Sequence, residues 1–209
     1  AQTDTRYTGN QATLAPSTGH IIIQGQATEA ALTPSDTFNL NLIDKAVTIA
    51  QTTTPMIRPI MVDGQPYYVA FLHPYQVYSL RTNTNSGQWL DIQKAAMTGG
   101  DVEDNPIFTG ALGCYNNVIL HQDFRIPNGV SSGSVIANTS RAVLCGAQAS
   151  VMAFGQDNSD QQMAWVEQLF DYGNQLGVSA GMIFGMKKTV FNSLDFGTVV
   201  MSTYSTAPT

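Results

Sequence analysis

The amino-acid sequence predicts an α+β fold. Helical patterns and short β-prone runs follow one another without the regular strand–helix–strand alternation of a parallel α/β sheet. The 209 residues are enough for one large domain or two small ones with a sizeable core. Charged residues make up only 11% of the chain, against about 25% in typical soluble domains. So low a charge favours a protein whose surface is partly covered by other subunits.

Three segments of the chain differ in their patterns. Residues 1–32 are rich in Thr, Gln and Gly and are predicted to form an extended lead-in with one strand at 21–23. Residues 33–110 are predicted to combine helices with a β-hairpin, and residues 111–209 to be rich in strands. The last two segments together are expected to form the folded core.

The first helix is predicted to begin near Thr33. Thr33 and Asp36 form a Thr-x-x-Asp capping signal, with Pro34 at the first helical position. Pro55 is expected to stop the helix. Between these limits the apolar residues follow helical spacing, at Phe38, Leu42, Ile43, Ala46, Ile49 and Ala50.

A β-hairpin is predicted next. Two β-prone runs, 57–62 and 67–72, stand on either side of Asp63-Gly64, which is the strongest short hairpin signal in the sequence. A short helix is then expected to begin at Pro74. A second helix is expected from Asn85 or Ser86, with Trp89, Ile92 and Ala96 buried and Gly99-Gly100 at its end.

The second half of the chain reads mainly as strands and turns. Strands are predicted at 118–121, 142–147 and 198–203, with a Gly/Ser/Asn loop at 128–134. One further helix is predicted over 160–170. Its apolar and acidic positions recur every three or four residues, at Met163, Val166, Glu167 and Phe170, and Gly173 follows.

No metal or cofactor site is predicted. Cys114 and Cys145 stand in apolar contexts, which favours two buried free thiols, with a single disulfide between them as the alternative. The histidines His20, His73 and His121 lack metal-binding spacing and are interpreted as packing residues. An acidic group is interpreted as a solvated turn, at Asp101, Glu103 and Asp104.

Three short motifs imitate catalytic signatures. Residues 129–133 and 177–181 both spell Gly-x-Ser-x-Gly, so a serine hydrolase using Ser131 or Ser179 is an alternative hypothesis. In such hydrolases the catalytic histidine follows the serine, yet no histidine follows His121. The triplet at 195–197 spells Asp-Phe-Gly without the other kinase motifs and is interpreted as a turn before a strand. The prediction is therefore a protein that is not an enzyme, with no catalytic residues.

Net charge and hydropathy restrict the partners. A net charge of -6 with only nine scattered Lys and Arg residues argues against sequence-specific nucleic-acid binding, which needs a basic patch to neutralise phosphates. The longest apolar runs, such as 67–72, fall far short of the ~20 residues that span a bilayer. Neither DNA recognition nor membrane insertion is predicted.

An ordered set of sequence strings resembles a family of phage proteins. It includes Phe71-Leu72-His73-Pro74 and Gln88-Trp89, and the whole set comprises residues 71–78, 81–84, 88–89, 91–97, 105–110, 141–149, 171–174 and 185–188. In this order the strings resemble the major capsid proteins of tailed double-stranded DNA bacteriophages, of the podophage type. The resemblance extends over residues 4–204, nearly the whole chain.

The resemblance implies the shell fold of tailed-phage coat proteins, with a peripheral and an axial domain. It implies a structural virion protein that self-assembles into the hexamers and pentamers of an icosahedral head, after synthesis in the host bacterial cytoplasm. Decoration, portal and scaffolding proteins are further candidate partners. Members of the family are longer at the N-terminus, so this chain is expected to lack the N-terminal arm and extended loop. A virion decoration or binding module is the third hypothesis.

Overall fold

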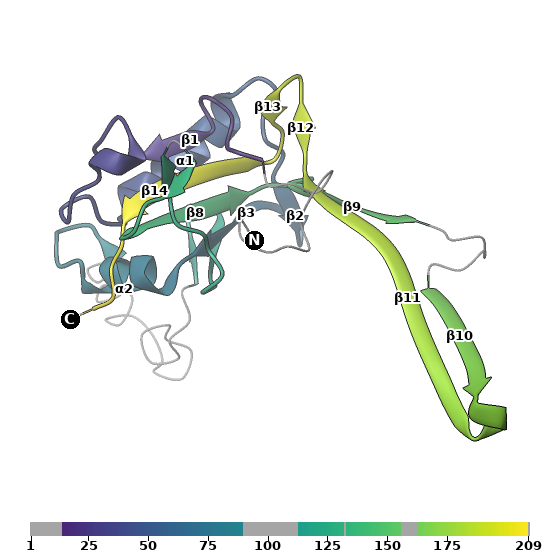
Figure 1. The fold of residues 1–209 in the computed structure, drawn as a ribbon. Helices are drawn as coiled ribbons and strands as arrows, with labels where there is room; N and C mark the ends of the chain where they lie inside the picture. The colour runs from purple at the N-terminus through teal and green to yellow at the C-terminus, as the bar shows by residue number, and fades with distance from the viewer. Residues whose placement is uncertain (1–13, 90–112, 132, 156–162, 209) are drawn as a thin grey trace, which may run out of the picture.

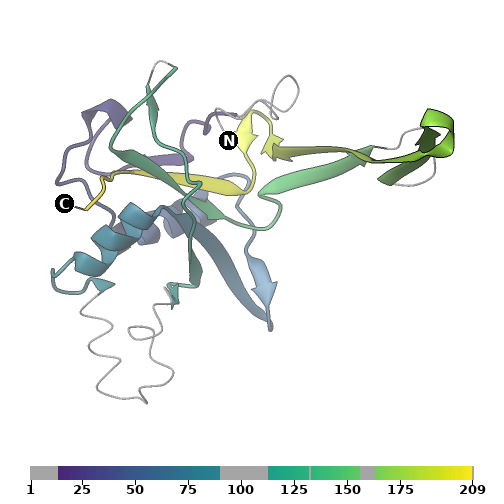
Figure 2. The same cartoon turned by 60° about the horizontal axis from the view of Figure 1, so that its bottom comes forward.

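The chain forms a helix-covered sheet, here called the body, and a long arm that projects from it (Figure 1). The computed structural model describes residues 14–89, 113–131, 133–155 and 163–208. Both views place the arm on one side of the body, away from the two helices (Figures 1 and 2). Helices and a mixed sheet occur together without strand–helix–strand repeats, so the predicted α+β class is confirmed.

The body contains a seven-stranded sheet in the order β1-β14-β8-β3-β5-β4, with β2 paired to β3. The pairs β1–β14 and β3–β5 are parallel, and the remaining pairs are antiparallel. The strands are β1 (Ile21–Ile23), β2 (Ile60–Val62), β3 (Gln65–Leu72), β4 (Cys114–Tyr115), β5 (Val118–Gln122), β8 (Thr139–Cys145) and β14 (Thr198–Tyr204). The strands predicted at 21–23, 118–121, 142–147 and 198–203 are therefore confirmed, with small shifts at their ends.

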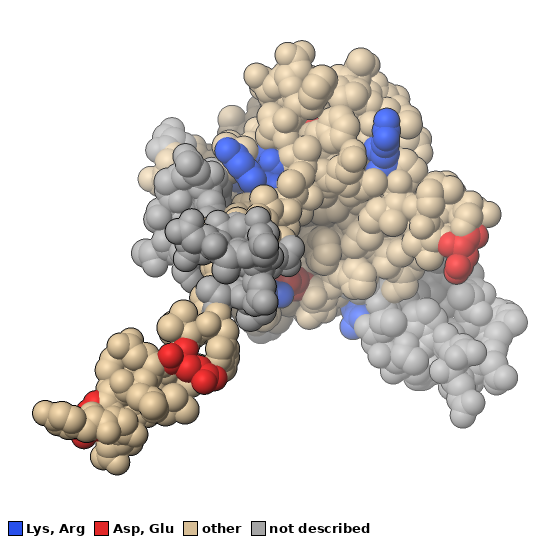
Figure 3. Space-filling view, turned by 90° about the vertical axis from the view of Figure 1, so that its right-hand side faces the viewer, with Lys and Arg blue, Asp and Glu red and all other residues tan. Residues whose placement is uncertain are grey.

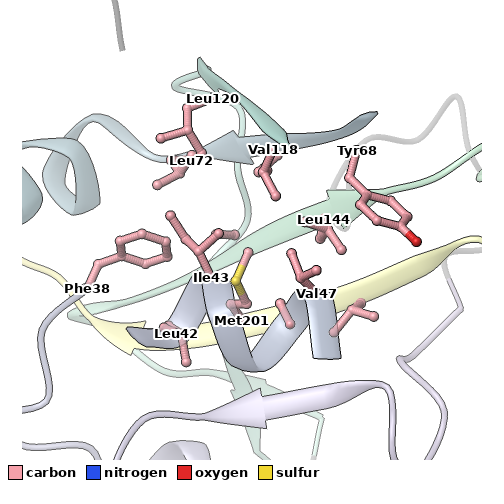
Figure 4. Packing of buried hydrophobic residues seen from close by; sticks show 14 of the residues in the cluster. Phe38, Leu42, Ile43, Val47, Tyr68, Leu72, Val118, Leu120, Leu144 and Met201 are labelled. Atoms are coloured by element: carbon pink, nitrogen blue, oxygen red, sulfur yellow. The ribbon is translucent and has the colours of Figure 1, made fainter. Parts of the chain in front are cut away.

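Two helices, α1 (Leu40–Thr52) and α2 (Pro74–Thr82), pack on the same face of this sheet. Leu144 has Ala70 and Val199 as its partners on the neighbouring strands, and all three side chains are fully buried. Val69, Cys145 and Thr198 lie next to these residues along the strands, so their side chains point to the opposite face of the sheet. Figure 4 shows the α1 side chains Ile43 and Val47 directed at this core. The other labelled members are Phe38, Leu42, Tyr68, Leu72, Val118, Leu120 and Met201.

The first helix exists as predicted, but its predicted start is wrong. Its N-cap is Asn39, whose side chain accepts a hydrogen bond from the Leu42 N–H at 3.1 Å. The Asp36 carboxylate instead accepts from the Thr33 N–H and hydroxyl, at 2.9 and 2.7 Å. Thr33 and Asp36 thus close a separate turn, because a side chain that caps its own loop is not available to a helix. The helix ends at Thr52, before Pro55 as expected.

The hairpin and the second helix are confirmed. Asp63 and Gly64 both have positive φ angles, 50° and 79°, the conformation that a two-residue turn between twisted strands requires. His73 is the N-cap of α2, and its side chain and that of Gln76 form a reciprocal capping box. The start predicted at Asn85 or Ser86 for the next helix is wrong, because residues 85–88 form a turn in which the Gln88 N–H donates to the Asn85 carbonyl. Trp89 is buried as predicted, and the rest of that predicted helix, with Ile92, Ala96 and Gly99-Gly100, lies outside the described residues.

The helix predicted over 160–170 is wrong. Met163–Phe170 is strand β10, paired antiparallel with the long strand β11 (Gln175–Lys188). The three- and four-residue spacing of Met163, Val166 and Phe170 is compatible with a helix, but β-branched and aromatic side chains favour the strand when a partner strand is present. Pairing with β11 therefore decides the structure, and the first residues of the predicted helix lie outside the described ranges.

Several smaller elements lie between the strands of the body and at the root of the arm. The loop predicted at 128–134 contains a tight hairpin of β6 (Val130–Ser131) and β7 (Ser134–Val135). The triplet at 195–197 links β13 (Leu194–Asp195) to β14, as expected for a turn before a strand, and β13 pairs with β12 (Val190–Phe191). The lead-in includes a 3-10 turn, η2 (Glu29–Ala31). The domain boundaries at 33 and 111 stay predictions.

Candidate functional site: the projecting arm

The arm consists of β9 (Ser150–Gly155), β10 and β11, with a 3-10 turn, η3 (Asp171–Gly173), at its tip. Strand β10 pairs with the first part of β11, and β9 pairs with the last part. At every level along β11 the described arm is therefore only two strands wide. The 14 residues of β11 span about 46 Å at ~3.3 Å per residue, so the ribbon reaches far beyond the body (Figure 1).

Alternation along the strands gives the arm one face of large apolar side chains. The registers place Leu169 beside Leu176 and Phe154 beside Phe184, and side chains of paired residues point to the same face. We call this surface the bulky face. Its nine large apolar residues are between 45% and 64% exposed: Met152, Phe154, Trp165, Leu169, Leu176, Val178, Met182, Phe184 and Met186.

The opposite surface, here called the glycine face, is flatter. It carries four glycines, Gly155, Gly177, Gly181 and Gly185, and four exposed apolar residues, Val151, Val166, Phe170 and Ile183. A Cβ at position 155 would lie 2.8 Å from the Ile183 side chain, and one at 177 would overlap the Phe170 ring. Glycine at these positions lets both side chains lie down across the ribbon.

The size of the bulky face indicates an interaction surface. A large apolar side chain has about 150–250 Å² in all, so nine that are half exposed offer roughly 1,000 Å². The largest apolar patch of a typical monomer is about 300–600 Å². A two-stranded ribbon of this kind is also marginally stable alone in water. We therefore take the bulky face as the candidate functional site.

An ion pair fixes the arm to the body at its root. The Lys188 Nζ lies 2.6 Å from the Asp195 Oδ1, and the two side chains are 21% and 1% exposed. Lys188 also donates to the Ala15 carbonyl at 2.9 Å. Asp195 accepts from the Ser17 N–H at 3.1 Å, and its own N–H donates to the Ser17 hydroxyl at 2.9 Å. The end of β11 is thus tied to both the lead-in and β13.

The charges on the arm are few and lie at its two ends. Glu167 and Asp171 lie in the distal half and at the tip, and Lys187 and Lys188 lie at the root. Figure 3 shows acidic side chains as two red groups on the outer part of the arm. Glu167 accepts a hydrogen bond from the Trp165 indole N–H at 2.8 Å, which holds the carboxylate beside the apolar surface.

The two Gly-x-Ser-x-Gly serines are not placed for catalysis. Ser131 ends the short strand β6, which turns directly into β7, and Ser179 lies in the middle of β11 opposite Val166. A nucleophile elbow needs a strand before the serine and a helix after it. Neither serine has that setting.

The described histidines and carboxylates do not form a metal centre. His20 is buried with its Nδ1 3.2 Å from the Thr198 carbonyl, and His121 stacks on Phe71. Within the described ranges, no three His, Cys, Asp or Glu side chains come together as metal ligands. The acidic group Asp101, Glu103 and Asp104 lies outside those ranges. Among the described helices, none is both long and apolar enough to span a bilayer.

The cysteines are free thiols on one row of the sheet. Cys114 pairs with Ile119, Ile119 with Val69, and Val69 with Cys145. Three strand spacings of ~4.8 Å place the two Cα atoms about 14 Å apart, beyond the ~7 Å limit for a disulfide. The disulfide alternative is therefore wrong, and both cysteines are free thiols. The predicted burial is wrong for Cys114, which is exposed on the edge strand β4, and Cys145 is half-buried. Burial raises the pKa of the Cys145 thiol to about 11.

Solved structures with a similar fold come from phage heads. The capsid of Ralstonia phage GP4 matches with a TM-score of 0.69 and 34% identity, covering 99% of this chain and 58% of that chain. The capsid asymmetric unit of Cyanophage Pam1 matches with a TM-score of 0.71 and 21% identity, covering 91% of this chain and 55% of that chain. The body with its arm is thus an α+β fold of the kind found in phage capsid subunits.

Sequence comparison leads to the same class. A curated relative, the major capsid protein of Pseudomonas phage KPP25, is 28% identical over an alignment of 200 residues that covers 87% of this chain and 49% of the relative. The chain thus spans about half the length of that relative. The family model described as phage capsid protein matches residues 1–207, so the chain belongs to the phage capsid protein family. The resemblance to tailed-phage major capsid proteins is confirmed, and the family is structural, not enzymatic.

Sequence reasoning did not predict the arm, although one signal for it was present. Every second residue of 176–186 is apolar and larger than glycine or serine, with small residues at most of the positions between. This period of two is that of a strand with unlike faces. The string at 177–181 was considered only as a catalytic motif and rejected as one, whereas its glycines Gly177 and Gly181 belong to the glycine face of a strand.

Proposed function

We propose that this protein is the shell-forming subunit of a tailed-phage head, and that its copies assemble into the icosahedral capsid that encloses the phage DNA. The observation that carries the proposal is the likeness to the Ralstonia phage GP4 capsid over almost the whole chain. The low charge of the chain and the exposed bulky face of the arm support it, because a shell subunit covers much of its surface with neighbours.

Within such a subunit, the body would be the axial part near the capsomer centre and the arm would supply peripheral strands. Two features support this division: β9, β10 and β11 form a sheet separate from that of the body, and the Lys188–Asp195 pair marks the junction. Hexamers and pentamers of the chain itself are the primary assemblies. Decoration, portal and scaffolding proteins would be secondary partners. The location of the mature protein would be the virion. The absence of the N-terminal arm and extended loop stays a prediction.

The competing functions have less support. A serine hydrolase would need an elbow that neither Ser131 nor Ser179 occupies. A decoration module would be expected to resemble proteins that bind a finished shell, whereas the family and the similar structures are capsid proteins themselves. A shell subunit is therefore the function that the observations favour.

Expression of the full-length gene product tests the proposal. Sedimentation velocity and negative-stain electron microscopy should detect closed shells, or free hexamers and pentamers. A product that stays monomeric at every concentration would contradict the proposal, as would stoichiometric labelling of Ser131 or Ser179 by a fluorophosphonate probe.

A further inference from the structure

We propose that Asn128 is a latent deamidation site, and that the Thr139 hydroxyl keeps it closed by holding the N–H of Gly129 in the folded protein. In the whole sequence an asparagine is followed directly by a glycine only at 128–129. This is the sequence with the least steric hindrance to deamidation, because glycine has no side chain to obstruct its own nitrogen. The proposal does not depend on the shell function.

The reaction needs the backbone nitrogen of Gly129 as its nucleophile. Hydroxide removes the proton of this nitrogen, which then forms a bond to the side-chain carbonyl carbon of Asn128. The bond from that carbon to the side-chain nitrogen breaks, and the nitrogen takes a proton from water and leaves as ammonia. Water opens the resulting five-membered ring at either carbonyl, which gives an aspartate or an isoaspartate at position 128. Asn128 is half-buried, so water can reach it.

The Thr139 hydroxyl engages this nucleophile. The Gly129 N–H donates to the Thr139 Oγ1 at 2.8 Å, and the hydroxyl itself donates to the Ile136 carbonyl at 2.8 Å. A hydroxyl has one proton and two lone pairs, so the bond to Ile136 turns a lone pair toward Gly129. Both Gly129 and Thr139 are buried. Removal of the Gly129 proton would leave a buried anion facing that lone pair, which is strongly unfavourable.

The peptide group on the other side of Gly129 is held as well. The Gly129 carbonyl accepts from the Ile136 N–H at 2.8 Å, and the Val130 N–H donates to the Glu29 carboxylate at 3.0 Å. Hydrogen bonds therefore fix both peptide groups that flank Gly129. A turn of the 128–129 peptide toward the Asn128 side chain would break the bond to Thr139 and leave a buried backbone N–H without its partner.

The same surroundings explain why glycine stands at position 129. A Cβ there would lie 2.8 Å from the Thr139 Oγ1 and 3.2 Å from the Glu29 carboxylate. A larger residue, which would slow the reaction by obstructing the nitrogen, does not fit between these two side chains. The hydrogen bond from Gly129 to Thr139 thus supplies the protection that a larger neighbour would give elsewhere.

Peptide mapping of the folded full-length chain tests the proposal. Trypsin releases residues 126–141 as one peptide, and fragment masses locate an amide-to-acid change at position 128. Thr139→Val keeps the shape of the side chain but removes the acceptor, so deamidation at position 128 should be at least tenfold faster than in the wild type at pH 8. Thr139→Ser retains the hydroxyl and should stay within threefold of the wild-type rate.

Ser140→Ala is the matched control for loss of stability. It removes a hydroxyl from the adjacent buried residue, whose side chain bonds to the Ser205 hydroxyl at 2.6 Å. The rate at position 128 should stay within threefold of the wild type. Equal acceleration by Thr139→Val and Ser140→Ala would mean that general loosening opens the site. No acceleration in a folded Thr139→Val chain would also overturn the proposal.

Hydrogen exchange in the wild type decides the matter if Thr139→Val does not fold. The Gly129 N–H should exchange at least tenfold more slowly in the folded chain than in the urea-unfolded chain. Deamidation at position 128 should be slowed by at least the same factor, since both reactions need the bond to Thr139 to open. A Gly129 N–H that exchanges as in the unfolded chain, or a folded chain that deamidates as fast as the unfolded one, would contradict the proposal.

Discussion

Glu29 and Arg141 form a buried, bidentate ion pair that joins the lead-in to the sheet. The Arg141 Nε and the nearer terminal nitrogen donate to the two Glu29 carboxylate oxygens at 2.7 and 2.6 Å, and the side chains are 12% and 5% exposed for Arg141 and Glu29. Ser202 of β14 and the Val130 N–H donate to the same carboxylate. One carboxylate thus connects η2 with β14, β8 and the β6–β7 hairpin.

Glu29→Gln should destabilise the fold strongly. The substitution keeps the shape of the side chain but leaves the Arg141 guanidinium buried without a counter-charge, and breaking a buried pair in this way costs about 3 kcal/mol. The free energy of unfolding, measured by urea denaturation, should fall by about that amount. The control is Asp123→Asn, which breaks the exposed Asp123–Arg125 pair and should leave the unfolding free energy unchanged within error. Equal effects of the two variants would contradict this account.

The same pair makes stability depend on pH in the acid range. Burial alone would raise the pKa of Glu29, but the hydrogen bonds from Arg141, Ser202 and Val130 and the charge of Arg141 hold that pKa below its ordinary value of 4.5. The stabilisation is therefore fully present above pH 4.5 and is lost as the pH falls through the lower, folded-state pKa. The difference in unfolding free energy between the wild type and Glu29→Gln should accordingly shrink below pH 4.5. A difference that grows there would show the opposite sign.

Lys188→Met should loosen the arm at its root. The variant leaves the Asp195 carboxylate, which is almost fully buried, without its cation. Hydrogen exchange at Ser17 and Asp195 should accelerate at least tenfold, and the unfolding free energy should fall. Lys187→Met is the matched control, because Lys187 is the adjacent lysine and is exposed on the opposite face of β11. Exchange that responds equally to both variants would rule out a specific role for the Lys188–Asp195 pair.

The two thiols should differ in reactivity. Burial raises the pKa of both thiols, but that of Cys145 reaches about 11, so little thiolate is present there at pH 8, and Cys114 is the exposed one of the two. With Ellman's reagent at pH 8, one thiol should react at least ten times faster than the other. The denatured chain should release two equivalents at one rate. Intact mass spectrometry before reduction should give the mass of the dithiol, and a mass lower by two hydrogens would mean that the cysteines pair.

The body could be predicted from sequence where local chemistry and long-range packing agree. Asp63-Gly64 adopts the positive φ angles that a two-residue hairpin turn needs, and Pro74 begins α2 behind the capping residue His73. The predicted start of α1 was wrong because the sequence holds two candidate capping residues, Thr33 and Asn39. Asp36 satisfies Thr33 within its own turn, and Asn39 caps the helix.

The arm could not be predicted from local patterns because its cause is not local. The spacing of Met163, Val166 and Phe170 fits one face of a helix, and only the pairing with β11 makes the segment a strand. Likewise, no pattern in the sequence joins Glu29 to Arg141, which are 112 residues apart in the chain. The capsid function was predicted from the ordered family strings, and the structure adds the exposed apolar face of the arm.

A cryo-electron microscopy reconstruction of particles formed by the full-length gene product tests the central claim most directly. The account predicts a closed shell built from this chain, in which the bulky face around Leu176 and Val178 is covered by protein. Absence of shells and capsomers under all assembly conditions would contradict the function. A shell in which the arm remains in solvent would contradict the role assigned to its bulky face.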